Sequence, residues 1–147
     1  MIKLSLSTFV DRIVENKRIT ASDVRELGRN VFPYGVTCRE EADILIALDR
    51  AVVAADPAWG CYLTAALVEF SVWTSRPTGY IDQDTAQWLA TTLACGSGPT
   101  DNAVQAAFEI VKEAQQVDQT LLAFVMGSSQ RWMRDSSRDA VADSLAA

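Results

Sequence analysis

The stretch PAWGCYLTAALVEFSVWTS, residues 57–75, decides the fold that this sequence predicts, because it is apolar over about five helical turns. Its single charged residue is Glu69. Asp56 and Pro57 at its start are an N-cap residue followed by proline at the first helical position, which is a strong start signal for a helix. We therefore expect a helix over residues 57–74. A helix that is apolar on every face either is buried or crosses a membrane.

Three features of this stretch favour burial over a membrane span. Glu69 lies inside it, Asp56 lies at its start, and no cluster of basic residues flanks it. Its 19 residues would also only just cross a bilayer. We therefore predict that residues 57–74 form the buried central helix of a soluble all-α protein that has no membrane span.

The composition of the chain fits one globular domain and disfavours several classes of site. The 147 residues are 49% hydrophobic, which is enough to form a core. There are 13 Lys and Arg against 19 Asp and Glu, and the net charge of −6 repels phosphate backbones, so we expect no nucleic-acid binding. Three widely spaced cysteines and the lack of histidine argue against a disulfide framework and a zinc site. The first residues lack the pattern of a signal peptide, so we expect a cytoplasmic protein.

Helical periodicity and capping signals recur along the rest of the chain. Thr20 is an N-cap with Asp23 at the third helical position, and Pro33 ends that helix. Asp82 and Asp118 are further N-caps. The helices are expected over residues 8–17, 19–32, 38–55, 57–74, 82–94 and 101–115, with a last one from residue 118.

These elements predict a compact bundle of six to seven helices. We expect a single all-α domain over residues 1–136 and a flexible or short helical tail over residues 137–147. No stretch alternates between apolar and polar residues over a useful length, which argues against a sheet. The strand-like pairs are Val36–Thr37 and Tyr80–Ile81, each directly after a glycine.

The two glycines suggest an internal repeat. Aligning Gly35 with Gly79 places GVTCREEADIL over GYIDQDTAQWL at an offset of 44 residues. The further matches are Ala42 with Ala86 and Leu45 with Leu89. So few matches also arise by chance, and the repeat is a hypothesis of two helix–loop–helix units that bury their apolar faces together. Each glycine would permit a positive φ at its turn.

Paired units with a glycine, a β-branched or aromatic residue and then a capped helix resemble a degenerate EF-hand pair. The region also resembles TerB-like helical domains, the fold associated with tellurite resistance, in its helix–loop–helix joints. The stretch ITASDVRELGRNVFPYGVTCREEADILIALDRAV is similar to a group of uncharacterised small bacterial proteins that carry GVxxREEADxLxALD. The resemblance covers roughly residues 19–95 and implies two EF-hand-like joints without calcium loops. No activity carries over with it.

The first glycine loop has the outer spacing of an EF-hand calcium loop but lacks its ligands. With Gly35 at position six, Glu41 stands at position twelve. Positions three and five are Phe32 and Tyr34, which offer no carboxylate, and the proline between them distorts the loop. In the second loop Arg76 would oppose a cation. We expect that neither loop binds a metal ion and that Glu41 is an acid at a helix N-terminus.

The remaining candidates for chemistry have structural interpretations beside functional ones. Cys38 lies at a helix N-terminus, as a capping residue or as a reactive thiol. Cys61 lies in the apolar helix, and we interpret it as a small core residue. Glu69 needs a partner such as Arg50 or Arg76, or it lines a pocket. Core positions, with one or two surface anchors among them, are expected for the tryptophans at 59, 73, 88 and 132.

We predict a non-enzymatic protein-interaction module: an adaptor, a regulator or an accessory subunit of a larger assembly. Its ligand would be a protein partner or a second copy of the chain, and it would need no cofactor. The reason is the lack of a catalytic set combined with a charge-poor, aromatic-rich centre. The alternatives are a small-ligand or divalent-metal sensor that uses Glu69 or Glu41, and an enzyme with a centre at Cys38 or a carboxylate. The expected contact residues are Tyr34, Arg76, Tyr80 and Trp132.

Overall fold

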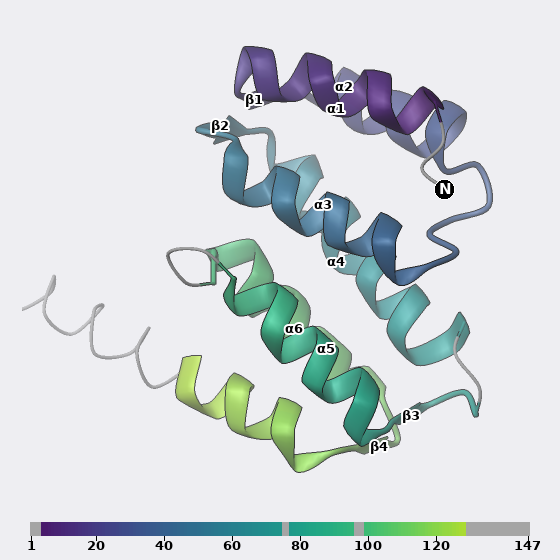
Figure 1. The fold of residues 1–147 in the computed structure, drawn as a ribbon, viewed down its shortest axis with the longest axis vertical. Helices are drawn as coiled ribbons and strands as arrows, with labels where there is room; N and C mark the ends of the chain where they lie inside the picture. Colours follow the sequence, from purple (N-terminus) through teal and green to yellow (C-terminus); the bar gives the residue numbers. More distant parts are fainter. Residues whose placement is uncertain (1–3, 75–76, 96–98, 129–147) are drawn as a thin grey trace, which may run out of the picture.

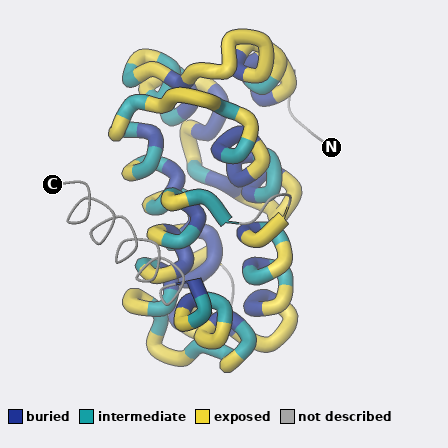
Figure 2. The backbone as a smooth tube through the Cα atoms, turned by 90° about the vertical axis from the view of Figure 1, so that its left-hand side faces the viewer, coloured by how far each residue is buried: buried dark blue, intermediate teal, exposed yellow. Residues whose placement is uncertain are grey.

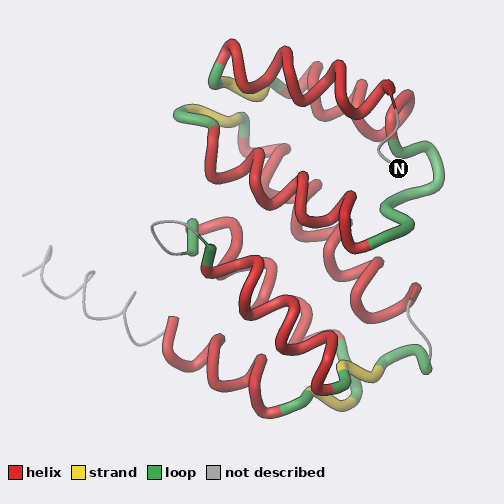
Figure 3. Tube along the Cα trace, viewed as in Figure 1, coloured by secondary structure: helices red, strands yellow, loops and turns green. Residues whose placement is uncertain are grey.

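The computed structural model describes residues 4–74, 77–95 and 99–128 of the chain. These residues form a helical bundle with four two-residue strands, which confirms the predicted all-α class (Figures 1 and 3). The first half holds α1 (Leu4–Asn16), β1 (Arg18–Ile19), α2 (Ala21–Glu26) with its π-helical continuation η1 (Leu27–Val31), α3 (Arg39–Ala51), β2 (Ala54–Ala55), and α4 (Pro57–Val68) with its π-helical continuation η2 (Glu69–Thr74). The second half holds β3 (Tyr80–Ile81), α5 (Gln83–Ala94), α6 (Asp101–Glu113), β4 (Gln116–Val117) and a last helix over residues 119–128. The described chain thus has seven α-helices, within the predicted range.

Two helix boundaries differ from the prediction for identifiable reasons. The first helix begins at Leu4 rather than at residue 8, because Leu6 adds one more turn to the buried stripe of Phe9 and Ile13. The helix α3 ends at Ala51 rather than at residue 55, because the backbone of Val52 is extended (ψ 144°) and leads into β2.

The helix α4 with its continuation η2 follows the prediction in length and start. Oδ1 of Asp56 accepts a hydrogen bond from the backbone N–H of Ala58 (3.0 Å), and Pro57 takes the first helical position. Its buried face consists of Trp59, Leu63 and Leu67, spaced four residues apart.

The predicted burial of this helix holds for one of its faces only. Cys61, which we interpreted as a core residue, is exposed. Ala65 and Glu69 follow it at four-residue spacing and are exposed as well. Because residues four apart share one side of a helix, α4 turns the apolar Cys61 and Ala65 outward, and Glu69 continues this side into η2. The same alternation of buried and exposed positions runs along the other helices (Figure 2).

The four short strands form two parallel pairs. β1 pairs with β2, with Arg18 opposite Ala54, and β3 pairs with β4, with Tyr80 opposite Gln116. Each strand directly precedes an N-cap residue of the next helix, and the pairs lie at opposite ends of the molecule (Figure 3). The predicted strand-like pair Tyr80–Ile81 is therefore confirmed, whereas Val36–Thr37 forms no strand.

The pairing reveals an internal repeat that differs from the one predicted. β1 begins at residue 18 and β3 at residue 80, and β2 begins at residue 54 and β4 at residue 116, so the separation is 62 residues in both cases. The separation of 44 residues aligns the joint at Gly79 with a plain loop at Gly35 instead. Both glycines nevertheless take the positive φ that we expected, 82° at Gly35 and 83° at Gly79.

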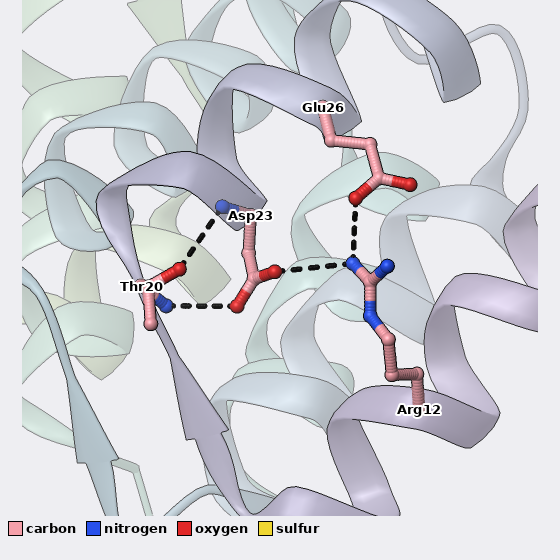
Figure 4. Close-up of polar contacts among 4 residues, drawn as sticks. All are labelled: Arg12, Thr20, Asp23 and Glu26. Carbon is pink, nitrogen blue, oxygen red and sulfur yellow. Dashed lines mark hydrogen bonds and ion pairs between the residues drawn. The ribbon is translucent and has the colours of Figure 1, made fainter.

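The N-terminus of α2 is fixed by a capping box that the sequence predicted. Oγ1 of Thr20 accepts from the backbone N–H of Asp23 (3.2 Å), and the Asp23 carboxylate accepts from the backbone N–H of Thr20 (3.0 Å). The guanidinium of Arg12 on α1 bridges Asp23 (3.1 Å) and Glu26 (2.7 Å), as Figure 4 shows. These contacts fix α1 against α2 at the surface.

A buried carboxylate joins α3, α4 and α6. Asp49 on α3 is 7% exposed. Its Oδ1 accepts hydrogen bonds from Nε1 of Trp59 (2.9 Å) and Nδ2 of Asn102 (2.8 Å), and its Oδ2 accepts from the hydroxyl of Thr100. Thr100 is also the N-cap of α6, where its hydroxyl accepts from the backbone N–H of Ala103 (3.0 Å). Asp49 therefore sets the start of α6 against the centre of the bundle.

A second polar seam joins the two halves of the chain through α3 and α5, which lie in front of α4 and α6 in Figure 1. Asp43 on α3 accepts from Nε1 of Trp88 (2.9 Å) and Oγ1 of Thr92 (2.8 Å) on α5. Arg39 pairs with Asp84 (2.8 Å) and lies over the ring of Trp88, 5.1 Å from its centroid.

Alkaline pH is expected to destabilise the protein through Tyr62 on α4. This ring stacks on Trp59, with centroids 6.3 Å apart, and partial burial raises the pKa of Tyr62 to about 12. Between pH 10 and 12 an unfolded tyrosine loses its proton while the folded one keeps it, so the free energy of unfolding falls as pH rises. After solvent screening the loss is of order 1 kcal/mol.

Chemical denaturation at pH 9, 10.5 and 12 measures this effect. Tyr62→Phe should retain more stability than the wild type at pH 12, and Tyr34→Phe, whose ring is exposed, should follow the wild type. Superimposable pH profiles for Tyr62→Phe and the wild type would contradict the assignment.

Candidate interaction groove

The structure describes two of the four predicted contact residues. Tyr34 is 95% exposed in the loop before α3, and Tyr80 is 42% exposed in β3. Tyr80 borders a cavity of about 630 Å³ beside β4, and Tyr34 is not among the residues that line that cavity. Arg76 and Trp132 lie outside the described residues.

A larger hollow lies between α4 and α6, with a volume of about 670 Å³. We call it the α4–α6 groove. Its α4 side is mostly apolar or small, and its α6 side is polar. The lining residues are Pro57, Gly60, Cys61, Thr64, Ala65, Val68, Glu69 and Trp73 from α4 and η2, and Asn102, Gln105, Glu109 and Glu113 from α6.

The two helices run side by side in the same direction. Near their N-termini Gly60 lies against Asn102, so closely that a Cβ on Gly60 would come within 2.7 Å of the Asn102 Oδ1. Near their C-terminal ends, the backbone N–H of Gly79 donates to the carbonyl of Val72 (2.7 Å). The backbone N–H of Gln115 donates to the carbonyl of Gly79 (2.8 Å). The lack of a side chain at Gly60 permits the close approach at one end, and the Gly79 turn fixes the other.

The C-terminal end of the groove is acidic. Glu69 contributes from η2 and Glu109 and Glu113 from α6, and no Lys or Arg within residues 4–74, 77–95 and 99–128 lines the groove. Nε2 of Gln105 donates to Oε1 of Glu109 (3.1 Å). Both helices also end here, and a helix C-terminus carries a partial negative charge. The groove therefore combines an apolar wall with a negative potential at one end.

Glu69 lies in the groove, and one of the two partners considered for it is engaged elsewhere. Arg50, one of the partners considered, donates instead to the carbonyl of Thr92 (2.9 Å), and Arg76 lies outside the described residues. Glu69 is exposed and lines the groove, as the pocket interpretation required.

Sequence reasoning missed most of the groove. Trp73 is 41% exposed and lines it, so it belongs with the surface anchors rather than with the core. The α6 side was also missed, although Gln105, Glu109 and Glu113 follow each other at four-residue spacing and so share one face. Glu109 and Glu113 have no basic residue four positions away on α6, and this was the signal in the sequence that could have indicated an acidic surface.

The residues of the first glycine loop act as a helix start. Cys38 is the N-cap residue of α3, but its side chain makes no capping hydrogen bond. Oε1 of Glu41 accepts from the backbone N–H (2.9 Å) and the hydroxyl (2.7 Å) of Thr37. Glu41 is 4% exposed and lies in the first turn of α3, as expected for an N-terminal acid.

In residues 4–74, 77–95 and 99–128 no three side chains of His, Cys, Asp and Glu lie together in a way that could hold a metal ion. Over the same residues, no helix has both the length and the apolar character needed to cross a membrane. Comparison of the chain with protein-family models, curated proteins and solved structures finds no match. The α4–α6 groove is therefore the feature on which a functional proposal rests.

Proposed function

We propose that this protein is a non-enzymatic interaction module that binds a protein partner in the α4–α6 groove. The observation that carries the proposal is the outward apolar side of α4 and η2, where Cys61, Ala65 and Trp73 line an open hollow instead of packing in the core. An exposed tryptophan beside small residues is typical of interface hot spots. The module would serve as an adaptor, a regulator or an accessory subunit, and it would need no cofactor.

The shape of the groove supports a helical ligand. It follows α4 and η2 from Pro57 to Trp73, which corresponds to roughly 25 Å of helix. This length accommodates about four turns of a partner helix. Small residues on the α4 wall, Cys61 and Ala65 among them, would allow a third helix to approach closely.

An arginine placed in the groove tests the proposal. Ala65→Arg puts a long side chain between the two walls, and Ala51→Arg makes the same change at an exposed position on α3. Each full-length variant is purified from the cells that naturally produce the protein, after melting curves have shown that it folds. We expect one partner to co-purify with the wild type and with Ala51→Arg, and to be lost with Ala65→Arg. A monomeric wild type without a partner, or equal recovery with all three proteins, would overturn the proposal.

A second candidate is a small-ligand sensor, because the groove volume of about 670 Å³ lies in the range of ligand pockets and Glu69 lines it. The divalent-metal form of this candidate is tested by calorimetry with Ca²⁺, Mg²⁺ and Mn²⁺. Heat of binding that disappears in Glu69→Gln would support it. The absence of both heat and a shift in Tm would overturn it.

A further inference from the structure

We infer that the occupant of the α4–α6 groove is a basic amphipathic helix of a partner protein, whose Arg or Lys side chains bind at the acidic end around Trp73. This inference rests on the proposed function, since it names the chemistry of the partner that the groove would bind. Its apolar face would cover Ala65 and Val68, and its cationic face would meet Glu69, Glu109 and Glu113.

Charge complementarity identifies the partner as basic. Among the residues that the structure describes, the lining includes three carboxylates and no cation. Among the described residues none of the three carboxylates takes part in an ion pair. Lys112, the basic residue in the last turn of α6, neither lines the groove nor pairs with them in the described structure. An acidic or neutral helix would therefore leave this end of the groove uncompensated or repelled.

Two features of the glutamates on α6 are unfavourable for that helix. Glu109 and Glu113 are four residues apart on α6, a spacing at which like charges destabilise a helix. Glu113 is also the last residue of α6, where a negative charge opposes the helix dipole. A cationic ligand would relieve both unfavourable interactions at once.

Trp73 would provide a second contact for a cationic side chain of the partner, in addition to the carboxylates. Its exposed ring lines the same groove as the three glutamates, and a guanidinium favours the face of an indole. The protein already makes this arrangement inside its own fold, where Arg39 lies 5.1 Å from the centroid of Trp88 and pairs with Asp84 at 2.8 Å. An arginine of the partner would find the same combination of ring and carboxylate in the groove.

Binding of synthetic peptides to the full-length protein tests the inference. The probe is an 18-residue amphipathic peptide with leucine and alanine on one face and arginine on the other; a second peptide has glutamate in place of every arginine. The two matched protein variants are Glu109→Gln/Glu113→Gln in the groove and Asp11→Asn/Glu15→Gln on the exposed face of α1, which remove the same charge. Kd is measured by fluorescence anisotropy at 50 and 300 mM salt.

We expect the arginine peptide to bind the wild type and Asp11→Asn/Glu15→Gln equally, and to bind Glu109→Gln/Glu113→Gln about tenfold more weakly at low salt. The glutamate peptide should not bind. Binding of both peptides alike, equal binding to both double variants, or no binding of the arginine peptide would overturn the inference. A wild-type dimer that Ala65→Arg dissociates would also overturn it, because a second copy would then fill the groove.

These outcomes are separate from the test of the proposed function. If Ala65→Arg loses a natural partner but peptides bind regardless of their charge, the proposed interaction module would be supported and the inference of a basic ligand would be wrong. Equal recovery of partners with Ala65→Arg and Ala51→Arg would overturn the proposed function itself.

Discussion

Replacing Asp49 with alanine should lower the free energy of unfolding by about 3–5 kcal/mol. The Asp49 carboxylate is buried and accepts hydrogen bonds from Trp59, Asn102 and Thr100. Alanine would leave the indole N–H of Trp59 in the core without an acceptor and would free the cap of α6 from α3. A buried donor without a partner costs about 1–3 kcal/mol, and three donors lose their acceptor together.

Urea denaturation followed by circular dichroism measures this loss. Asp49→Asn keeps one acceptor oxygen and should lose less, about 1–2 kcal/mol. Asp11→Ala removes an exposed carboxylate on α1 and should stay within about 0.5 kcal/mol of the wild type. A loss below about 1 kcal/mol in Asp49→Ala would show that this carboxylate does not hold the three helices together.

The second large effect is expected at Leu63. Its side chain is fully buried on the inner face of α4, and Leu63→Ala should destabilise the protein by about 2–5 kcal/mol through lost burial and the cavity left behind. Cys61→Ala, two residues earlier on the same helix, removes one sulfur atom from an exposed position and should cost less than about 0.5 kcal/mol.

The contrast between these two variants tests which face of α4 is turned inward. Thermal and urea unfolding of the two variants, measured side by side, provide the comparison. Equal losses would mean that Cys61 is as buried as Leu63, and the α4–α6 groove would then have no open apolar wall.

Local signals in the sequence predicted local structure well. The caps at Thr20, Asp56 and Asp82 each depend on a side chain and a backbone N–H within three residues, and all three form as expected. The positive φ at Gly35 and Gly79 is likewise a property of the turn itself. Such contacts can be predicted from the sequence because both partners lie in the same short stretch of chain.

Contacts between distant residues could not be read in this way. The repeat at 62 residues preserves few identities, among them Ile19 with Ile81, and the alignment on glycines fixed a different offset. The strand pairs are two residues long, too short to give a periodic pattern. Asp49 likewise gave no signal, because its three donors come from residues 10 to 53 positions away.

The sequence by itself determined the all-α class, the length of the central helix and the caps that start the helices. These follow from apolar content, proline and short-range hydrogen bonds, which act within a few turns. Only the tertiary structure decided which face of α4 is exposed. That helix is apolar all round, so no polar stripe in its sequence marks the exposed face. The direction is set when α2, α3 and α6 cover Trp59, Leu63 and Leu67, and this packing leaves Cys61, Ala65 and Trp73 to line the groove opposite α6.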